Sequence, residues 1–177
     1  TRGIEGIIQA IKYARENKLP YLGLCYGMQL ATIEFARHVL GLKDAHTVEV
    51  NPKTKNPIIH INPLQAKNVS TNRYGGTMRL GAYDCVLKIG SKTLQAYGQK
   101  KISERHRHRY EFNNEYKEAI NQAGLQIVGV NEEKNLVEIV ELKDHPFFVG
   151  TQFHPELKSR PTRPHPLFVG LMKAALK

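Results

Sequence analysis

A lone cysteine stands where a protein could use it as a nucleophile. Cys25 lies between Gly23 and Gly27, directly after the apolar run that ends at Leu24. A Gly-x-Cys-x-Gly pattern between a strand and a helix is typical of a nucleophile elbow, whose central residue is strained and whose neighbours must be small. The thiol would lie at a helix N-terminus, which lowers a thiol pKa and directs the backbone N–H of Tyr26 at an oxyanion. The alternative is a buried core cysteine between two incidental glycines.

The sequence also contains a candidate general base for this thiol, far from Cys25 along the chain. His154 and Glu156 follow an apolar run at 147–153, in the order Phe-His-Pro-Glu. In an extended loop the side chains at i and i+2 can lie on one side, so Glu156 could fix the tautomer of His154 while the other ring nitrogen faces Cys25. A solvated loop is the alternative for an isolated His-Pro-Glu. Both groups follow predicted strands, and open α/β sheets bind ligands at that edge.

Hydrophobic periodicity predicts the elements that must position these residues. Apolar spacing predicts helices over 4–17, 27–40, 114–123 and 166–176, and strands over 20–24, 85–89, 125–130, 136–142 and 147–153. The turn formers at 51–57 and 68–77 predict loops. The alternation of helix and strand favours an α/β fold with an open, mostly parallel sheet flanked by helices. We expect one domain over residues 1–177, because this length suits a single core.

Composition narrows the class of protein. The 177 residues contain only two cysteines, which argues against a disulfide framework or a paired-cysteine zinc site and for a thiol environment. No stretch is apolar enough for a membrane span, and Thr1 begins no apolar signal region, so a cytoplasmic location is expected. The formal charge of +10 predicts attraction to phosphate-bearing partners, nucleotide or nucleic acid alike.

Taken together, the motifs resemble the triad (class I) glutamine amidotransferases. The stretches Cys25-Tyr-Gly-Met-Gln29 and Gln152-Phe-His154-Pro-Glu156 carry that resemblance. Three longer motifs narrow it to the glutaminase domains of CTP synthases. They are Arg2-Gly3-x-Glu5-Gly6, Gly75-Gly-Thr-Met-Arg-Leu-Gly81 and Glu104-Arg-His-Arg-His-Arg-Tyr-Glu111.

The resemblance implies a reaction and a role for each matching residue. Cys25 would attack the side-chain amide of glutamine and form a γ-glutamyl thioester, with His154 as general acid and base and Glu156 as its partner. The family's substrate contacts fall on Gln29, Glu49 and Arg109. Glu49 suits the α-ammonium group of glutamine, and the planar guanidinium of Arg109 suits its α-carboxylate.

The resemblance also implies a lid, further ligands and an assembly. The lid residues would be Gly75, Gly76, Thr77, Met78, Arg79, Leu80 and Gly81. In CTP synthases this lid is tied to GTP, the allosteric activator, and Arg79 could reach a phosphate or the reaction site. The glutaminase domain itself would need no cofactor or metal. ATP and Mg would act in a synthetase domain that aminates UTP to CTP, and the full-length enzyme would be a homotetramer.

The sequence departs from the family pattern in two ways. Tyr26 stands where most members carry Leu, and a backbone N–H contact should tolerate that change. In the family, the first strands and the glycine-rich loop that supplies the second oxyanion N–H lie just before Arg2-Gly3. Neither that part nor the synthetase domain is in this chain. The chain is therefore expected to be a glutaminase domain truncated at its N-terminus.

The sequence leaves three rival interpretations open. A nucleic-acid-binding module would account for the basic run at 100–109, although no motif of such modules is present. A γ-glutamyl hydrolase, or an amidotransferase with another acceptor, would share the triad. A fragment without activity is the third, because losing one oxyanion donor costs about 10²–10³ in rate.

Overall fold

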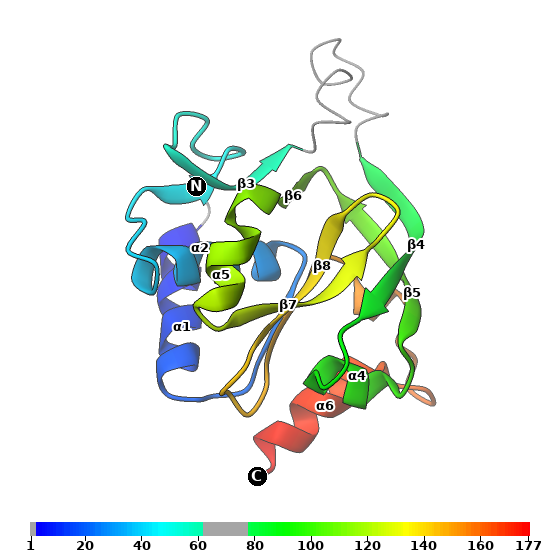
Figure 1. The fold of residues 1–177 in the computed structure, drawn as a ribbon. Coiled ribbons are helices and arrows are strands. Elements are labelled where there is room, and N and C mark those ends of the chain that lie inside the picture. Colours follow the sequence, from blue (N-terminus) through cyan, green and yellow to red (C-terminus); the bar gives the residue numbers. More distant parts are fainter. Residues whose placement is uncertain (1–2, 62–77) are drawn as a thin grey trace.

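A six-stranded sheet organises the molecule. The computed structural model describes residues 3–61 and 78–177 (Figure 1). The strand order is β1-β9-β8-β7-β4-β5. The strands are β1 (Tyr21–Leu24), β4 (Arg79–Leu87), β5 (Lys101–His108), β7 (Leu125–Asn131), β8 (Leu136–Leu142) and β9 (Phe148–Thr151).

Helices and a smaller sheet surround it. The helices are α1 (Ile4–Glu16), α2 (Tyr26–His38), α4 (Lys92–Tyr97), α5 (Lys117–Gln122) and α6 (Pro166–Ala175), with single 3₁₀ turns η2 (Asn114–Tyr116) and η3 (Pro155–Leu157). The smaller sheet joins β2 (Ala45–Thr47), β3 (Asn56–Ile61) and β6 (Tyr110–Phe112) in that order. Among the described residues, no helix is both long and apolar enough to cross a membrane.

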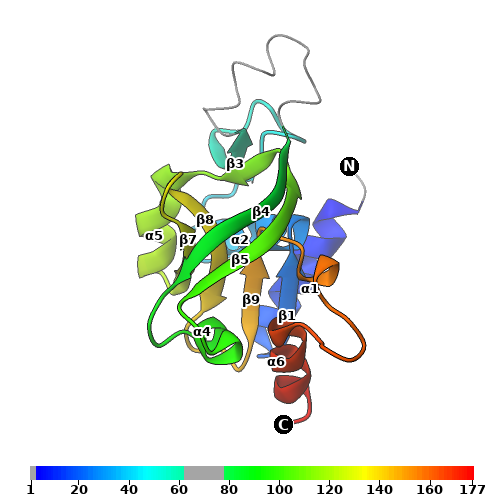
Figure 2. The ribbon, with the colours of Figure 1, turned by 90° about the vertical axis from the view of Figure 1, so that its right-hand side faces the viewer.

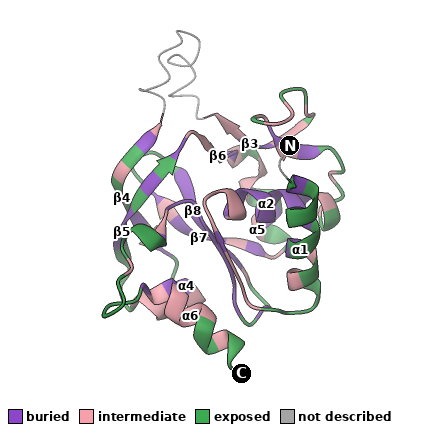
Figure 3. Cartoon of the chain, turned by 180° about the vertical axis from the view of Figure 1, so that it is seen from behind, coloured by how far each residue is buried: buried purple, intermediate pink, exposed green. Residues whose placement is uncertain are grey.

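The core has two parts because alternate residues of a strand face opposite sides of the sheet. In β7, Ile127 packs with α1 and α2, whereas its neighbour Val128 packs in the cluster that includes Leu167 of α6. Figure 3 shows α2 largely buried, and the outer side of α1 exposed. The two helix layers therefore cover the two faces of the sheet around β7, and β9 lies inside the sheet between β1 and β8.

The α/β class with flanking helices is confirmed, but the expected mostly parallel pairing is corrected. In the described part of this sheet, β1 and β9 pair in parallel, and the remaining pairs are antiparallel. The physical reason lies in the connections. Short links join β7 to β8 and β8 to β9, and such links suit antiparallel neighbours, whereas parallel strands need a long crossover.

The predicted helices over 4–17, 27–40 and 166–176 are confirmed as α1, α2 and α6. The predicted strands are confirmed as β1, β7, β8, β9 and the end of β4. The 114–123 segment divides into η2 and α5. Strand β5 was not predicted, and its residues alternate between exposed and buried over its whole length.

Polar side chains fill three of the four inward positions of β5, and Ile102 fills the other. Glu104, His106 and His108 are all buried, and Nδ1 of His106 lies 3.0 Å from Nε2 of His108. Burial, followed by the positive charge of Arg79, lowers the pKa of His106 to about 2 and that of His108 to about 3. Burial raises the pKa of Glu111 to about 8. His106, His108 and Glu111 are therefore mostly uncharged at neutral pH, which limits the cost of burying them.

Candidate active site

The backbone at Cys25 has the geometry of a nucleophile elbow. Cys25 directly follows β1 and is the N-cap of α2, with φ 48° and ψ −99°. A non-glycine residue with positive φ is uncommon, and such strain costs on the order of 1–3 kcal/mol. The backbone N–H of Cys25 donates to the carbonyl of Thr151 at 2.6 Å, which ties the elbow to β9. The structure thus holds the cysteine in a conformation it would not adopt alone.

The elbow depends on the absence of a side chain at Gly23. A Cβ there would lie 2.5 Å from the Tyr21 hydroxyl oxygen and 2.7 Å from the carbonyl carbon of Gly27. The Tyr21 hydroxyl donates to the Gly27 carbonyl at 2.9 Å, so it helps to hold the first turn of α2 in place. The close approach of strand and helix explains why the residue two before the cysteine is glycine.

We expect Gly23→Ala to disrupt the elbow. The added methyl group meets backbone of α2, which cannot move without shifting Cys25. The variant should lose about 1–3 kcal/mol in its free energy of unfolding, the usual cost of overpacking. Urea denaturation followed by circular dichroism measures this loss.

Gly6→Ala is the matched control. Gly6 lies in α1, and a Cβ there would have no heavy atom within 4 Å. Because alanine favours helix over glycine, this variant should gain about 0.5–1 kcal/mol. Equal unfolding free energies for the two variants would contradict the proposed close packing at Gly23.

The candidate base and its partner form a short hydrogen bond. Nδ1 of His154 lies 2.6 Å from Oε1 of Glu156. A carboxylate oxygen accepts, so Nδ1 carries the proton, and Nε2 is left as the basic nitrogen. Nε2 is buried and has no hydrogen-bond partner among the described residues. The expected juxtaposition of His154 and Glu156 is present, and the tautomer it favours leaves one nitrogen able to take a proton.

The cysteine and the histidine lie at the same edge of the sheet. Leu24 of β1 pairs with Thr151 of β9 in parallel register, and these residues end their strands. Cys25 follows directly, and His154 comes three residues after Thr151. The backbone N–H of His154 donates to the carbonyl of Arg105 in β5 at 2.8 Å. Segments far apart in the sequence are therefore held together by main-chain hydrogen bonds.

The electrostatics of the thiol differ from expectation. Burial is the main cause that raises the pKa of the Cys25 thiol to about 11, and the carboxylates of Glu156, Glu111 and Glu49 act in the same direction. The backbone N–H of Tyr26 hydrogen-bonds the sulfur and lowers this pKa. Loss of water thus outweighs the effect of the helix N-terminus. The resting thiol is protonated at neutral pH, so a base is needed to form the thiolate.

Sequence reasoning did not assign a site role to Gln152, which lies beside the sulfur. Its Nε2 is 3.6 Å from Cys25 Sγ, and the side chain is fully buried. The amide of Gln29 donates to Oε1 of Gln152 at 3.2 Å and to the carbonyl of Tyr110 at 3.0 Å. Gln29 therefore connects α2 to β6 beneath the site. The only sequence signal for Gln152 was its place two residues before His154.

The remaining substrate candidates, Glu49 and Arg109, are linked to the site through their charges. The charge of Glu49 acts on the pKa values of Cys25, Tyr26 and Tyr110. Burial raises the pKa of Glu49, and the positive charge of Arg109 lowers it. Arg109 lies between β5 and β6. Glu49 thus lies close enough to influence the thiol, and Arg109 lies close enough to influence Glu49.

The predicted lid is only partly described. Gly75, Gly76 and Thr77 lie outside the described residues, and Arg79 to Gly81 begin β4. We expected Arg79 to reach a phosphate or the reaction site. Its side chain instead is 3% exposed, pairs with Glu138 at 2.6 Å and packs over the ring of Tyr83. A guanidinium with a buried carboxylate partner is held in the interior.

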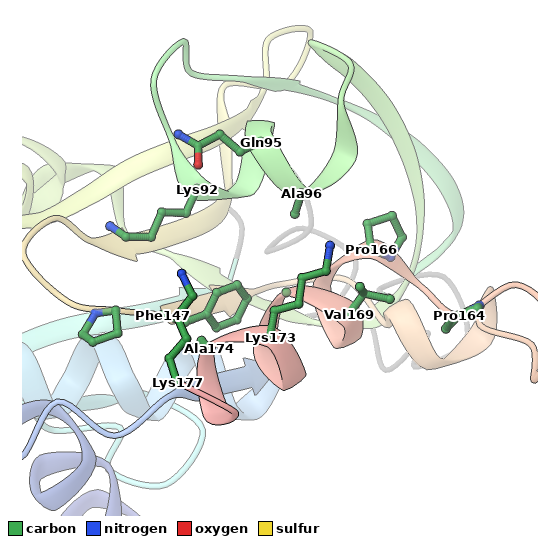
Figure 4. Close-up of a pocket in the computed structure, with 12 residues that line it drawn as sticks. Lys92, Gln95, Ala96, Phe147, Pro164, Pro166, Val169, Lys173, Ala174 and Lys177 are labelled. Carbon is green, nitrogen blue, oxygen red and sulfur yellow. The ribbon is translucent and has the colours of Figure 1, made fainter.

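The site is distinct from a groove beside α6. That groove, about 700 Å³, lies between α4 and α6, with Phe147 and three lysines at its walls (Figure 4). Phe147 precedes β9, whereas His154 follows it, so the groove and the site lie at opposite ends of that strand. No group of three or more His, Cys, Asp or Glu side chains within 3–61 and 78–177 could hold a metal ion.

Comparisons with known proteins agree with this geometry. The family model for glutamine amidotransferase class-I matches residues 1–174. The chain is 59% identical over 174 residues to the CTP synthase of Cytophaga hutchinsonii, covering 98% of this chain and 32% of that protein. It is 58% identical over 175 residues to the CTP synthase of Caldanaerobacter subterraneus, again over 32% of its length. The chain thus spans about a third of these relatives.

Solved structures give the same result. The chain superposes on the Trypanosoma brucei CTPS glutaminase domain with bound acivicin with a TM-score of 0.92, at 37% identity, over 99% of this chain and 67% of that one. A glutamine amidotransferase from Thermotoga maritima shares the fold alone, with a TM-score of 0.53 at 15% identity. The chain belongs to the class-I glutamine amidotransferases, as its motifs predicted. Within that family it groups with the glutaminase domains of CTP synthases.

Proposed function

We propose that this domain hydrolyses glutamine to glutamate and ammonia through a cysteine thioester. The observation that carries the proposal is the placement of Cys25 and of the His154–Glu156 pair at the ends of two adjacent parallel strands. One group is a strained, partly buried thiol, and the other is an imidazole whose tautomer is fixed by a carboxylate. A nucleophile, a base and an orienting acceptor are the parts that acyl transfer requires.

The reaction would proceed in two balanced halves. Nε2 of His154 takes the thiol proton while Sγ of Cys25 attacks the amide carbon, and the resulting oxyanion accepts from the backbone N–H of Tyr26. The imidazolium then gives its proton to the leaving nitrogen, so ammonia departs and a γ-glutamyl thioester remains. Water, deprotonated by the same nitrogen, attacks the thioester and releases glutamate with the thiol restored.

Substrate recognition would use the two ends of glutamine. The guanidinium of Arg109 suits the α-carboxylate, and the carboxylate of Glu49 suits the α-ammonium group. Their mutual electrostatic influence supports a position at one rim of the site. Gln29 would act by positioning, since its amide hydrogens bond Tyr110 and Gln152.

The role of the ammonia is a further part of the proposal. The relatives are CTP synthases of which this chain spans 32%. We therefore propose that a synthetase domain of the same polypeptide uses the ammonia for ATP- and Mg-dependent amination of UTP. GTP activation, a homotetramer and a cytoplasmic location stay predictions from the resemblance.

Labelling with the glutamine analogue 6-diazo-5-oxo-norleucine tests the site itself. We expect one equivalent of label on Cys25 of the parent protein, located by peptide mass spectrometry. Glutamine carries the same two charged ends as the analogue, so excess glutamine should compete for the site and slow the labelling.

Cys85 supplies the internal control. It is fully buried in β4, and burial raises the pKa of its thiol well above the usual range. It should stay unmodified. Equal modification of both cysteines, or labelling that glutamine does not slow, would refute the proposed site.

A further inference from the structure

A second hollow lies on the outer side of the β4–β5 hairpin, next to the segment that follows β9. The groove has a volume of about 670 Å³. The small residues Ala82 and Ser103 lie on the strands, and Arg105, Lys158, Arg160 and Arg163 line it. Figure 2 looks onto this hairpin, with the segment after β9 beside β5. Cys25 does not line this groove, so it differs from the candidate active site.

The charges of this groove have one sign. Each charged side chain that lines it is a cation. Lys158 is partly compensated, because its Nζ lies 3.4 Å from the buried Glu104 and 2.6 Å from the carbonyl oxygen of Ser103. Arg105, Arg160 and Arg163 form no ion pair with a carboxylate in the described part of the chain. Three guanidinium groups thus face one hollow without a neutralising partner there.

The backbone brings two of these charges together. Arg160 and Arg163 form an antiparallel bridge, with N–H···O distances of 3.2 and 3.1 Å between their main chains. Residues directly opposite in such a bridge project to the same face, and like charges there are unfavourable. The Arg160 guanidinium also donates to the Ser159 carbonyl at 2.6 Å. A bound anion would offset this repulsion.

We propose that this groove binds an oligophosphate group. Guanidinium forks match phosphate oxygens in pairs, and several arginines around one hollow suit a chain of phosphates better than a single anion. Ser103 adds a hydroxyl donor, and the volume lies in the range of small-ligand sites. The group can come from free inorganic polyphosphate or from a nucleotide, and the chemistry recognised is the same.

Titration calorimetry with sodium tripolyphosphate at about 0.15 M ionic strength tests the proposal, because salt at that level screens diffuse attraction. The double variant Arg105→Gln/Arg163→Gln removes two cations whose side chains hold no other part of the described structure. We expect it to weaken binding at least about tenfold relative to the parent, since charge-assisted bonds are the strong ones. Arg160→Gln, from the other side of the bridge, should weaken it in the same direction.

Lys53→Gln/Lys55→Gln is the matched control. These exposed lysines flank Thr54 in the link between β2 and β3, and their loss changes the net charge by the same amount. The control should bind tripolyphosphate as the parent does. Absence of binding to the parent would overturn the proposal. An equal loss of affinity in both double variants would also overturn it, because it would mean that the overall positive field of the protein attracts the anion. Circular dichroism melts confirm that each variant is folded.

Two further arms identify the source of the phosphate. ATP without added metal is titrated into the same proteins, and tighter binding than tripolyphosphate assigns the groove to nucleotides, whereas weaker binding assigns it to free oligophosphate. Tripolyphosphate is also titrated into the full-length parent enzyme. Binding to this chain but not to the full-length enzyme would mean that protein covers the groove, and would overturn the proposal.

Discussion

Replacing Cys25 with alanine is expected to abolish release of ammonia from glutamine. The variant keeps the backbone of the elbow but loses the atom that would form the thioester. Loss of the nucleophile in a hydrolytic triad reduces kcat by about 10⁶, which leaves only what substrate binding and the oxyanion donor provide. Ammonia release by the full-length enzyme, measured with a coupled glutamate dehydrogenase assay, gives the comparison.

Cys85→Ala is the matched control for this loss. It removes the other thiol of the chain, from a buried position in β4. That variant should lose some stability and keep its ammonia release. Retained release at the parental rate in Cys25→Ala would refute the thioester mechanism, while loss in both variants would point to a folding defect. Amination driven by added ammonia should persist in Cys25→Ala, because it bypasses the glutaminase domain.

Replacing His154 with alanine is expected to lower kcat by about 10⁴-fold or more, because it removes both proton transfers of the proposed reaction. The change should also alter the pH dependence of thiol reactivity. With a Cys25 pKa near 11, only about one thiol in 10⁴ is ionised at pH 7 without a base. Alkylation of Cys25 by iodoacetamide in His154→Ala should therefore rise about tenfold per pH unit from pH 7 to 10.

The parent protein should behave differently at neutral pH. When His154 can accept the thiol proton, the alkylation rate at pH 7 is higher, and its pH dependence is flatter. His60→Ala, in β3 of the smaller sheet, serves as the matched histidine control and should follow the parent. Superimposable profiles for the parent and His154→Ala would show that His154 is not the base for this thiol.

The elements with an apolar inner face could be predicted from the sequence. Ile4, Ile8 and Ile11 recur at helical spacing, and each is buried against the sheet in α1. Strand β5 was not predicted because its inner face carries Glu104 and His106 in place of apolar residues. Hydrophobic periodicity registers burial only when the buried side chains are apolar. A strand that buries carboxylate and imidazole groups can be recognised only in the structure, where Arg79 and other partners surround these groups.

The candidate site could likewise be predicted only in part from the sequence. Cys25, His154 and Glu156 could be singled out because each lies in a short motif whose chemistry is local. The 3.6 Å approach of Gln152 to the sulfur depends on the register between β1 and β9, which the sequence does not encode locally. The raised thiol pKa depends on burial by distant segments in the same way. The inward turn of Arg79 requires Glu138, 59 positions later in the numbering of the chain.

The outer edge of β5 has a consequence for association between molecules. An uncovered edge strand is a template for strand addition and aggregation. Here the carbonyl of Arg105 accepts from the backbone of His154, and the carbonyl of Ser103 accepts from Lys158. A foreign strand that paired with this edge would have to displace the proposed base. The hydrogen bond from His154 therefore both blocks this edge and positions the proposed base.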